Sequence, residues 1–194
     1  MRVYRIHPSD STSSYLPSHR VTNEGVWYLA PWLIIDFFYK RRKLPLNAPS
    51  LASLVSEVVL SLLVYDFLFY FGHRFLHANK GLYSSLHAKH HKESNIRAVE
   101  AIRHTFLDGS LNTAFSVLAL RITRAHPLSR AVYNVVAIAM LADAHSGYNL
   151  PWALSNVIPL RLVGGAVEHE KHHRVGNKIF ATHFTYLDYL FGTN

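Results

Sequence analysis

The 194-residue chain contains no cysteine. Zinc fingers, iron–sulfur clusters and disulfide bonds all need cysteine sulfur, so these features are excluded. Any metal ion must therefore be held by nitrogen or oxygen. Acidic residues are also few, since 12 Asp and Glu stand against 20 Lys and Arg, for a formal charge of +8. Such a basic chain suits an anionic partner, either a nucleic acid or a membrane surface.

The chain also lacks the local motifs of several enzyme classes. There is no GxGxxG, GxxxxGK[ST] or GxSxG sequence, so dinucleotide binding, P-loop chemistry and serine hydrolysis have no signature here. The segment His169–His173 fits the HExxH pattern of metalloproteases, but that motif supplies only two histidine ligands and leaves the other histidine clusters unexplained. Haem needs only one or two histidine ligands and would not explain repeated histidine clusters.

Hydrophobic residues make up 49% of the chain and gather in runs. This is more apolar than a nucleic-acid module needs, so we favour a membrane surface over nucleic acid as the anionic partner. The length is enough for one domain with a sizeable core. We expect a polar N-terminal segment with an interfacial helix over residues 1–50 and a catalytic domain over residues 51–194.

The apolar runs differ in length. Val26–Tyr39 is too short to span a bilayer of ~30 Å and is followed by a basic cluster, Lys40–Lys43, which predicts an interfacial helix. Leu51–Phe71 is long enough to span. Leu111–Ile122 and Ala131–Leu141 are shorter and predict a helical hairpin. The predicted fold class is all-α: integral membrane helices with a cytosol-facing helical cap that holds a histidine-rich dimetal site.

Fourteen histidines are present, and eight of them fall into three clusters. HRFLH sets two histidines four residues apart, on one face of a helix. HAKHH and HEKHH share an HxxHH form with helical spacings of three and four. The eight are His73, His77, His87, His90, His91, His169, His172 and His173. Neutral imidazole is the commonest metal ligand, and eight exceed the four that a tetrahedral zinc takes, so we predict two metal ions.

Each cluster has an ordinary explanation when taken alone. An HxxxH pair on a helix is often a pair of surface or core histidines, and HxxHH beside lysine can be a solvated basic face. Three clusters in one chain favour the metal interpretation. Imidazole suits iron, zinc, copper and nickel alike, so the ligand type leaves the metal open.

Two carboxylates are candidate catalytic residues. Asp66 follows the spacing of His73 and His77 and so shares their helix face. Metal-bound imidazoles usually donate their second N–H to a carboxylate or a carbonyl, so we predict that Asp66 accepts from the metal-binding histidines. Asp188 lies in an aromatic tail and is interpreted as a structural or supporting carboxylate. His183, in the same tail, is interpreted as structural.

Five motifs occur in order: HRFLH, HAKHH, AHSGYNLPW, HEKHH and FTYLDYLFGT. Over roughly residues 62–194 they resemble the fatty acid hydroxylase/sterol desaturase superfamily of membrane-bound di-iron oxygenases, and most closely its C-4 methylsterol oxidase branch. The resemblance implies two Fe ions, with Zn in a purified or inactive form, and O2-dependent oxidation of a lipid C–H bond, in particular a sterol C-4 methyl group.

The resemblance adds two metal ligands. His145 matches a histidine of the sterol oxidase branch, and His104 lies where family members often have another histidine. Thr105 stands where a proline often follows, so a helix-terminal His104 paired to Glu100 is the alternative. Asn149 replaces a second histidine that some relatives carry.

The resemblance also implies partners and a location. These are a lipid or sterol substrate, O2, cytochrome b5 with its reductase as electron donors, and a multi-pass place in the endoplasmic reticulum membrane with the metal site facing the cytosol. The alternatives are a fatty-acid, sphingolipid or alkane hydroxylase, a non-catalytic metal-binding membrane protein, or a fragment that lacks a membrane hairpin.

Overall fold

The computed structural model describes residues 4–6, 19–38, 45–92 and 96–194. Within these ranges the chain is helical, with no named β-strand and only two isolated bridges, Arg5 with Tyr148 and Val163 with Phe184. The predicted all-α fold is confirmed. The basic cluster Lys40–Lys43 and His7 lie outside the described residues.

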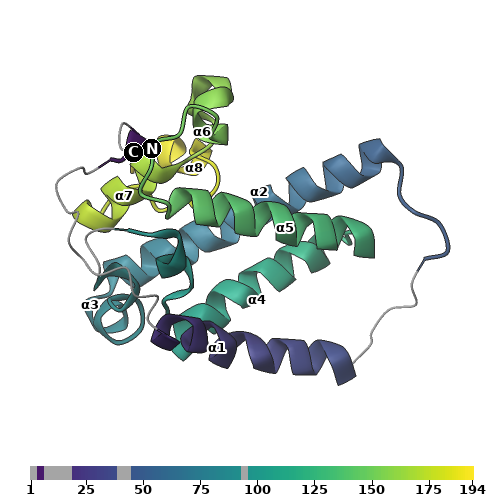
Figure 1. The fold of residues 1–194 in the computed structure, drawn as a ribbon, viewed down its shortest axis with the longest axis horizontal. Helices are drawn as coiled ribbons and strands as arrows, with labels where there is room; N and C mark the ends of the chain where they lie inside the picture. Colours follow the sequence, from purple (N-terminus) through teal and green to yellow (C-terminus); the bar gives the residue numbers. More distant parts are fainter. Residues whose placement is uncertain (1–3, 7–18, 39–44, 93–95) are drawn as a thin grey trace.

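Four long helices lie side by side and carry a cap of short elements at one end (Figure 1). The long helices are α1 (His19–Phe38), α2 (Leu51–Ala78), α4 (Phe106–Ile122) and α5 (Pro127–Ala144). The short elements are α3 (Lys80–Leu82), the π-helix η2 (Tyr83–His87), the 3-10 helices η3 (His90–Lys92), η4 (Ala98–Ile102) and η5 (Pro159–Arg161), and α6 (Leu154–Val157), α7 (Ala166–Val175) and α8 (Tyr186–Leu190). The cap brings distant parts of the sequence to one end of the bundle.

The central helix α2 begins at Ser50, whose side chain accepts the backbone N–H of Ser53 at 3.1 Å. By length and composition α2 is the one described helix that could cross a membrane. It is longer than the predicted span Leu51–Phe71, since it continues through HRFLH to Ala78. His73 and His77 therefore stand on the same rigid rod as the apolar segment.

Helices α4 and α5 follow one another across a short turn, but each packs mainly on α2, and both are longer than the apolar runs that predicted them. Thr105 caps α4 by accepting the N–H of Asp108, and His126 caps α5 by accepting the N–H of Leu128 at its Nδ1. Pro127 follows in the first turn of α5, where its missing N–H costs nothing. His126 thus lies at the end of the turn between α4 and α5.

Helix α1 packs against α4 and η4. The Tyr28 hydroxyl donates to the Ile102 carbonyl at 3.2 Å, and the Tyr28 ring lies so close to Gly109 that a Cβ there would come within 2.5 Å of it. Glycine is therefore what lets α1 approach α4. This helix has 20 residues, with Pro31 inside, and is longer than the predicted interfacial helix. The division of the chain at residue 50 stays a prediction.

Two clusters of buried apolar side chains hold these elements together. The first joins α2, α4 and α5 through Val58, Leu62, Tyr65, Ala119, Leu120, Ala125 and Tyr133. The second joins α2 to the C-terminal segment through Tyr70, Phe180, Ala181 and Leu187. The C-terminal segment is thus anchored on the same helix that carries the first histidine cluster.

Candidate metal centre

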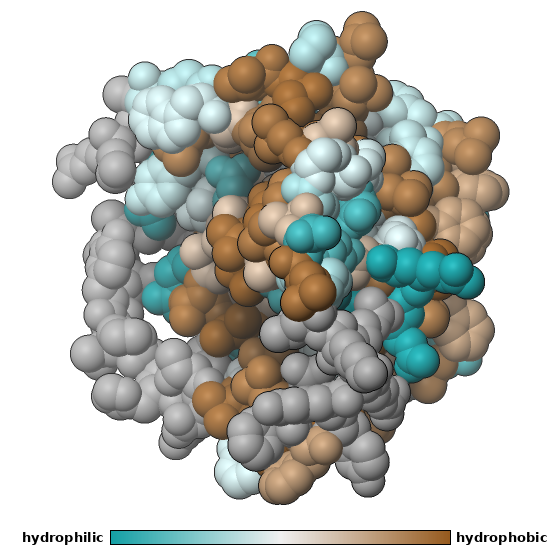
Figure 2. Space-filling view, turned by 90° about the vertical axis from the view of Figure 1, so that its right-hand side faces the viewer, coloured by the Kyte–Doolittle hydropathy of each residue, from teal (hydrophilic) through white to brown (hydrophobic). Residues whose placement is uncertain are grey.

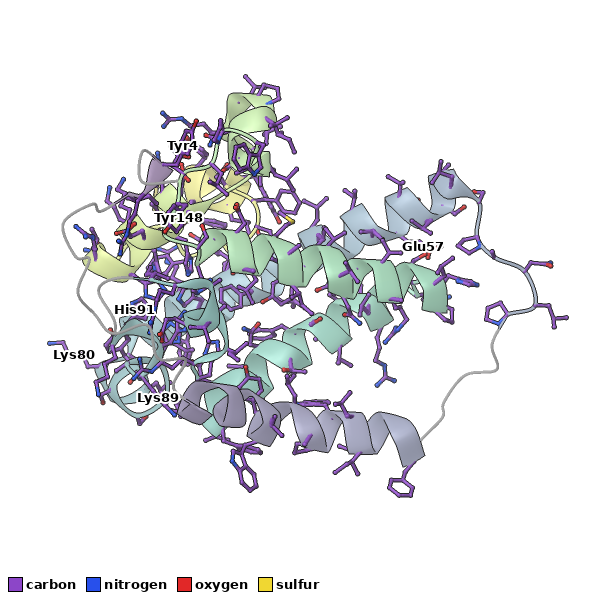
Figure 3. All side chains as sticks on the ribbon, viewed as in Figure 1. Tyr4, Glu57, Lys80, Lys89, His91 and Tyr148 are labelled. Atoms are coloured by element: carbon purple, nitrogen blue, oxygen red, sulfur yellow. The ribbon has the colours of Figure 1, made fainter. Side chains whose placement is uncertain are left out.

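The histidine side chains converge at the cap end of the bundle. Figure 3 shows His91 near this end, while Glu57 lies toward the opposite end of the long helices. Among the described residues, nine imidazoles form two groups, and within each group one ring nitrogen per residue lies within 4.8 Å of the others. We refer to them as the five-histidine group and the four-histidine group.

The five-histidine group takes side chains from four elements. His73 and His77 come from α2, His87 from η2, His91 from η3 and His172 from α7. The Nε2 atoms of His73 and His87 are 3.0 Å apart, and those of His73 and His77 are 3.1 Å apart. His91 Nε2 lies 3.1 Å from His87 Nε2 and 3.2 Å from His172 Nε2. All five rings therefore turn the same nitrogen to a common centre.

The four-histidine group is built in the same way from His90, His145, His169 and His173. His169 Nε2 lies 2.9 Å from His145 Nε2 and 3.1 Å from His173 Nε2. His145 Nε2 lies 3.4 Å from His90 Nε2. His145 thus lies among the clustered histidines.

The two HxxHH motifs are shared between the groups. In HAKHH, His87 and His91 belong to the five-histidine group and His90 to the other. In HEKHH, His169 and His173 belong to the four-histidine group while His172 reaches the five-histidine group. Each motif thus gives its outer pair to one group and its middle histidine to the other, which ties the groups together.

The backbone of HAKHH differs from the helical spacing assumed in the sequence analysis. HEKHH lies on the α-helix α7, but HAKHH runs from a π-turn ending at His87 into a 3-10 turn starting at His90. Both backbones give the same division, since in each motif the outer two histidines join one group and the middle histidine joins the other.

The hydrogen bonds of the other ring nitrogens fix which nitrogen carries the proton. His73 Nδ1 donates to the Phe180 carbonyl at 2.8 Å, and His172 Nδ1 donates to the Lys178 carbonyl at 2.7 Å. His145 Nδ1 donates to the Leu141 carbonyl at 2.9 Å. A carbonyl oxygen can only accept, so in a neutral ring the proton lies on Nδ1 and Nε2 bears a lone pair.

These lone pairs are the test of whether a metal ion fits. Lone pairs that face one another at about 3 Å repel unless a cation lies between them. Two nitrogens that bind one ion at about 2.0–2.1 Å lie about 3.0 Å apart at a right angle and about 3.4 Å apart at the tetrahedral angle. The Nε2–Nε2 distances of 2.9–3.4 Å fall in this range. Both groups therefore fit a metal ion.

A proton is a poor substitute for that cation. Burial lowers the pKa of His90 and of His169 well below the ordinary value of 6.5, and the neighbouring imidazoles lower it further. Burial likewise lowers the pKa of His91 to about 2 and those of His145 and His172 to about 4. At neutral pH these rings are uncharged and available as ligands.

Asp66 does not take the role predicted for it. Its buried carboxylate accepts the backbone N–H groups of Thr182, His183 and Phe184 at 3.0, 2.8 and 3.2 Å, instead of a histidine side chain. The side chain leaves α2 on the face that meets the C-terminal segment. Asp66 thus fixes this segment to α2 and acts on the histidines only through it.

Asp188 holds the same segment from the other side. Its carboxylate accepts the N–H groups of Phe180 and Ala181 at 2.9 and 3.1 Å and the Thr193 hydroxyl at 2.7 Å. Burial raises the pKa of Asp188. The Phe180 carbonyl accepts from His73, so the two aspartates together position an oxygen that orients a histidine. The structural interpretation of Asp188 agrees with these contacts.

The carboxylate that contacts a clustered histidine is Asp108, which no sequence motif indicated. Asp108 accepts from His87 Nδ1 at 3.0 Å and from His104 Nδ1 at 2.8 Å, and all three residues are buried. His104 is outside both groups, and its Nε2 faces the Ala101 carbonyl at 3.1 Å. The four-residue spacing between His104 and Asp108 could have indicated their contact. Glu100 lies four residues before His104, so the sequence offered it as an equally good partner. Glu100 instead pairs with Arg97 and Arg103.

Two other residues lie apart from the groups. His183 is buried against the Tyr65 ring at a centroid distance of 5.3 Å, and burial lowers the pKa of His183 to about 4. Asn149 accepts at its Oδ1 from Asn156 at 2.6 Å, and its backbone N–H donates to Tyr4. Neither belongs to a histidine group among the described residues.

A narrow cavity runs from the histidines between α2, α4 and α5. The imidazoles that line it include His73, His87, His90, His145 and His169. Its other walls are mostly apolar and include Phe69, Leu76, Leu111, Phe115 and Leu141. Tyr65 and Asn112 add one polar pair, in which the Tyr65 hydroxyl donates to Asn112 Oδ1. The free space is about 20 Å³, roughly that of one water molecule, so a larger ligand enters only if side chains move.

An all-α scaffold that brings nine imidazoles into two groups defines a protein suited to a dimetal centre. The chain belongs to the fatty acid hydroxylase family, whose family model matches residues 58–193. The family expected from the five motifs is thereby confirmed.

Several proteins of similar sequence have names that state a function. Cholesterol 25-hydroxylase of Mus musculus is 32% identical over 196 residues, covering 100% of this chain and 66% of that protein. The Homo sapiens protein of the same name is 31% identical and is covered to 72%. A very-long-chain aldehyde decarbonylase of Oryza sativa subsp. japonica is 32% identical over 205 residues, covering 98% of this chain and 74% of that protein. The chain thus spans just under two thirds of the mouse relative. No solved structure matches it.

The depressed histidine pKa values predict how the metal-free chain responds to acid. In the unfolded chain a histidine gains a proton below about pH 6.5, whereas folded His145 and His172 do so only near pH 4. Between these values the unfolded state binds more protons, so the free energy of unfolding falls by about 1.4 kcal/mol per pH unit for each such histidine. After chelation, the melting temperature should drop steeply from pH 6.5 to pH 4. A melting temperature that stays constant over this window contradicts neutral, buried imidazoles.

Proposed function

We propose that this protein is an O2-dependent di-iron oxygenase that oxidises an unactivated C–H bond of a lipid. The observation that carries the proposal is the pair of imidazole groups whose lone pairs converge at distances suited to metal ions, in a chain of the fatty acid hydroxylase family. The proposed metal ligands are the nine histidines of the two groups. His104, which the resemblance suggested as a tenth, has both ring nitrogens directed at oxygen atoms and is proposed to support them instead.

Iron is proposed over zinc because of the chemistry required. Imidazole nitrogens accept either metal, but zinc has no redox activity, and oxidation of a C–H bond by O2 needs a metal that changes its oxidation state. Two iron ions bound here would supply O2 activation and hydrogen abstraction. A non-catalytic protein that binds zinc is the alternative, and product formation separates the two.

The contribution of the chain is to orient and to shield the site. The Phe180, Lys178 and Leu141 carbonyls fix the tautomers of three ligand histidines. The aromatic and aliphatic walls of the cavity keep bulk water from the imidazoles. We propose that a lipid chain or sterol ring displaces the Leu111 and Phe115 side chains and lies along this cavity, with its reacting carbon next to the histidines.

The relatives favour a sterol side chain or a long alkyl chain as the substrate. Oxidation of a sterol C-4 methyl group is the second candidate, supported by the motifs HSGYNLPW and GGAVEHEKHH. Away from the imidazoles and Asp108, the cavity wall is apolar apart from Tyr65, Asn112 and Thr182, which suits any of these lipids. The products therefore have to be identified directly.

A membrane location fits the surface. Apolar side chains are exposed along the long helices, including Trp27, Leu33, Leu60, Phe67, Val135 and Ile138. Figure 2 shows apolar side chains running down the middle of the end that lies opposite the cap, with hydrophilic side chains among and beside them. A lipid environment accounts for this exposure better than water does. We propose that α2 spans the endoplasmic reticulum membrane with the cap in the cytosol, where cytochrome b5 and its reductase supply electrons.

The substrate class is tested by turnover. The purified chain, loaded with Fe(II) and supplied with O2 and an electron donor, should oxygenate members of a panel of sterols, fatty acids, alkanes and long-chain aldehydes, as followed by mass spectrometry and 18O2 incorporation. A hydroxylated sterol side chain supports one candidate, and an oxidised C-4 methyl group supports the other. If an iron-loaded chain oxidises no lipid under any of these conditions, the enzyme proposal fails.

The cavity is tested by filling it. Leu111→Trp places a larger ring on the α4 wall, and we expect turnover to fall at least about tenfold while the iron content is unchanged, because overpacking blocks the substrate without touching a ligand. Leu118→Trp, two turns further along α4 and exposed, is the matched control and should keep wild-type activity. Equal activity of both variants would contradict the assignment of the cavity.

A further inference from the structure

Asp108 is the one described carboxylate that meets a clustered histidine and a histidine outside the groups at the same oxygen. Its Oδ2 accepts from His87 at 3.0 Å and from His104 at 2.8 Å. The Asp108 side chain is 6% exposed, and those of His87 and His104 are 3% and 6% exposed. A buried carboxylate costs much desolvation energy unless it is fully hydrogen-bonded, so these two contacts hold one another in place.

His104 in turn supports a member of the other group. Its ring stacks on the His90 ring with centroids 4.5 Å apart and an interplanar angle of 11°. His90 belongs to the four-histidine group, whereas His87 belongs to the five-histidine group. The pair of Asp108 and His104 therefore touches one ligand of each group.

The stacking contact matters for His90 because no hydrogen-bond acceptor among the described residues holds its ring at Nδ1. Its Nδ1 is buried and has no hydrogen-bond partner within the part of the chain that the structure describes, unlike the Nδ1 atoms of His73, His145 and His172, which donate to carbonyls. His173 Nδ1 is also buried without a partner among these residues, and its ring stacks on His91 at a centroid distance of 4.3 Å and an interplanar angle of 22°. Where the acceptor is missing, a stacked imidazole from outside the ligand's own group takes its place.

We propose that Asp108 and His104 form a positioning unit that links the two metal sites, and this inference rests on the proposed dimetal function. Asp108 keeps the proton of His87 on Nδ1, so that Nε2 faces the five-histidine centre. His104, itself held by Asp108 and by the Ala101 carbonyl, fixes the ring plane of His90. His104 acts through its flat face and not as a ligand, since both its nitrogens point at oxygen atoms.

The test separates stacking from ligation. The full chain in detergent is loaded with 57Fe(II) without oxygen, and bound iron is measured by mass spectrometry and by Mössbauer spectroscopy. His145→Ala and His77→Ala serve as references, because each removes a ligand from only one group. We expect His104→Ala to reduce iron binding at the four-histidine group by about 10- to 100-fold and to reproduce the spectrum of His145→Ala.

Two further variants complete the design. His104→Phe keeps a flat ring over His90 but loses the hydrogen bond to Asp108, so it should bind clearly more iron than His104→Ala. Iron binding as low as that of His104→Ala would show that the ring face does not position His90, which overturns the inference. Asp108→Asn should weaken both groups. Glu57→Gln makes the same carboxyl-to-amide change at the far end of α2, where Glu57 accepts the His126 N–H, and should bind iron as the wild type does.

The remaining outcomes are also decisive. An unchanged spectrum in His104→Ala, or equal loss of iron from both groups, overturns the positioning unit while the proposed function stands. A wild-type chain that takes up no iron overturns the proposed function and this inference with it. Thermal unfolding of each variant before loading shows whether lost iron reflects a lost fold.

Discussion

Repulsion between imidazole lone pairs is the constraint on which this structure depends. Carbonyl and carboxylate acceptors fix the proton on Nδ1 of four rings, so that their Nε2 lone pairs point at neighbouring Nε2 atoms about 3 Å away. These four rings are His73, His87, His145 and His172. Burial disfavours protonation, so a proton does not relieve the repulsion. The cap therefore holds the histidine ligands together against their own repulsion. Bound cations would remove this repulsion and stabilise the folded cap.

Hydrogen bonds and packing in the rest of the fold hold the histidine side chains in place. Helix α2 carries HRFLH on a rigid rod, and Asp66 and Asp188 bind the backbone of residues 180–184 from opposite sides. Helix α4 places Asp108 next to His87, and the end of α5 places His145 next to His169. Because the two HxxHH motifs divide their histidines between both groups, each motif contributes to both centres.

Much of this arrangement could be predicted from the sequence, since it depends on local spacing. The all-α fold followed from the lengths of the apolar runs, and the eight histidines of HRFLH, HAKHH and HEKHH followed from their clustering. Other features depend on contacts between distant segments. The backbone partners of Asp66 come from residues 182–184, and no local pattern indicates that a peptide segment would displace a histidine there. The division of each HxxHH motif between two groups depends on the distant histidines that meet it, such as His73 and His145, which local spacing does not reveal.

The central claim is that both groups hold a metal ion. The most direct measurement is an experimental density map of the iron-loaded chain, with anomalous scattering at the iron edge to locate the ions. The account predicts two peaks, one within reach of the Nε2 atoms of His73, His77, His87, His91 and His172 and one within reach of those of His90, His145, His169 and His173. A map with no peak, or with one peak held by surface side chains, would contradict it.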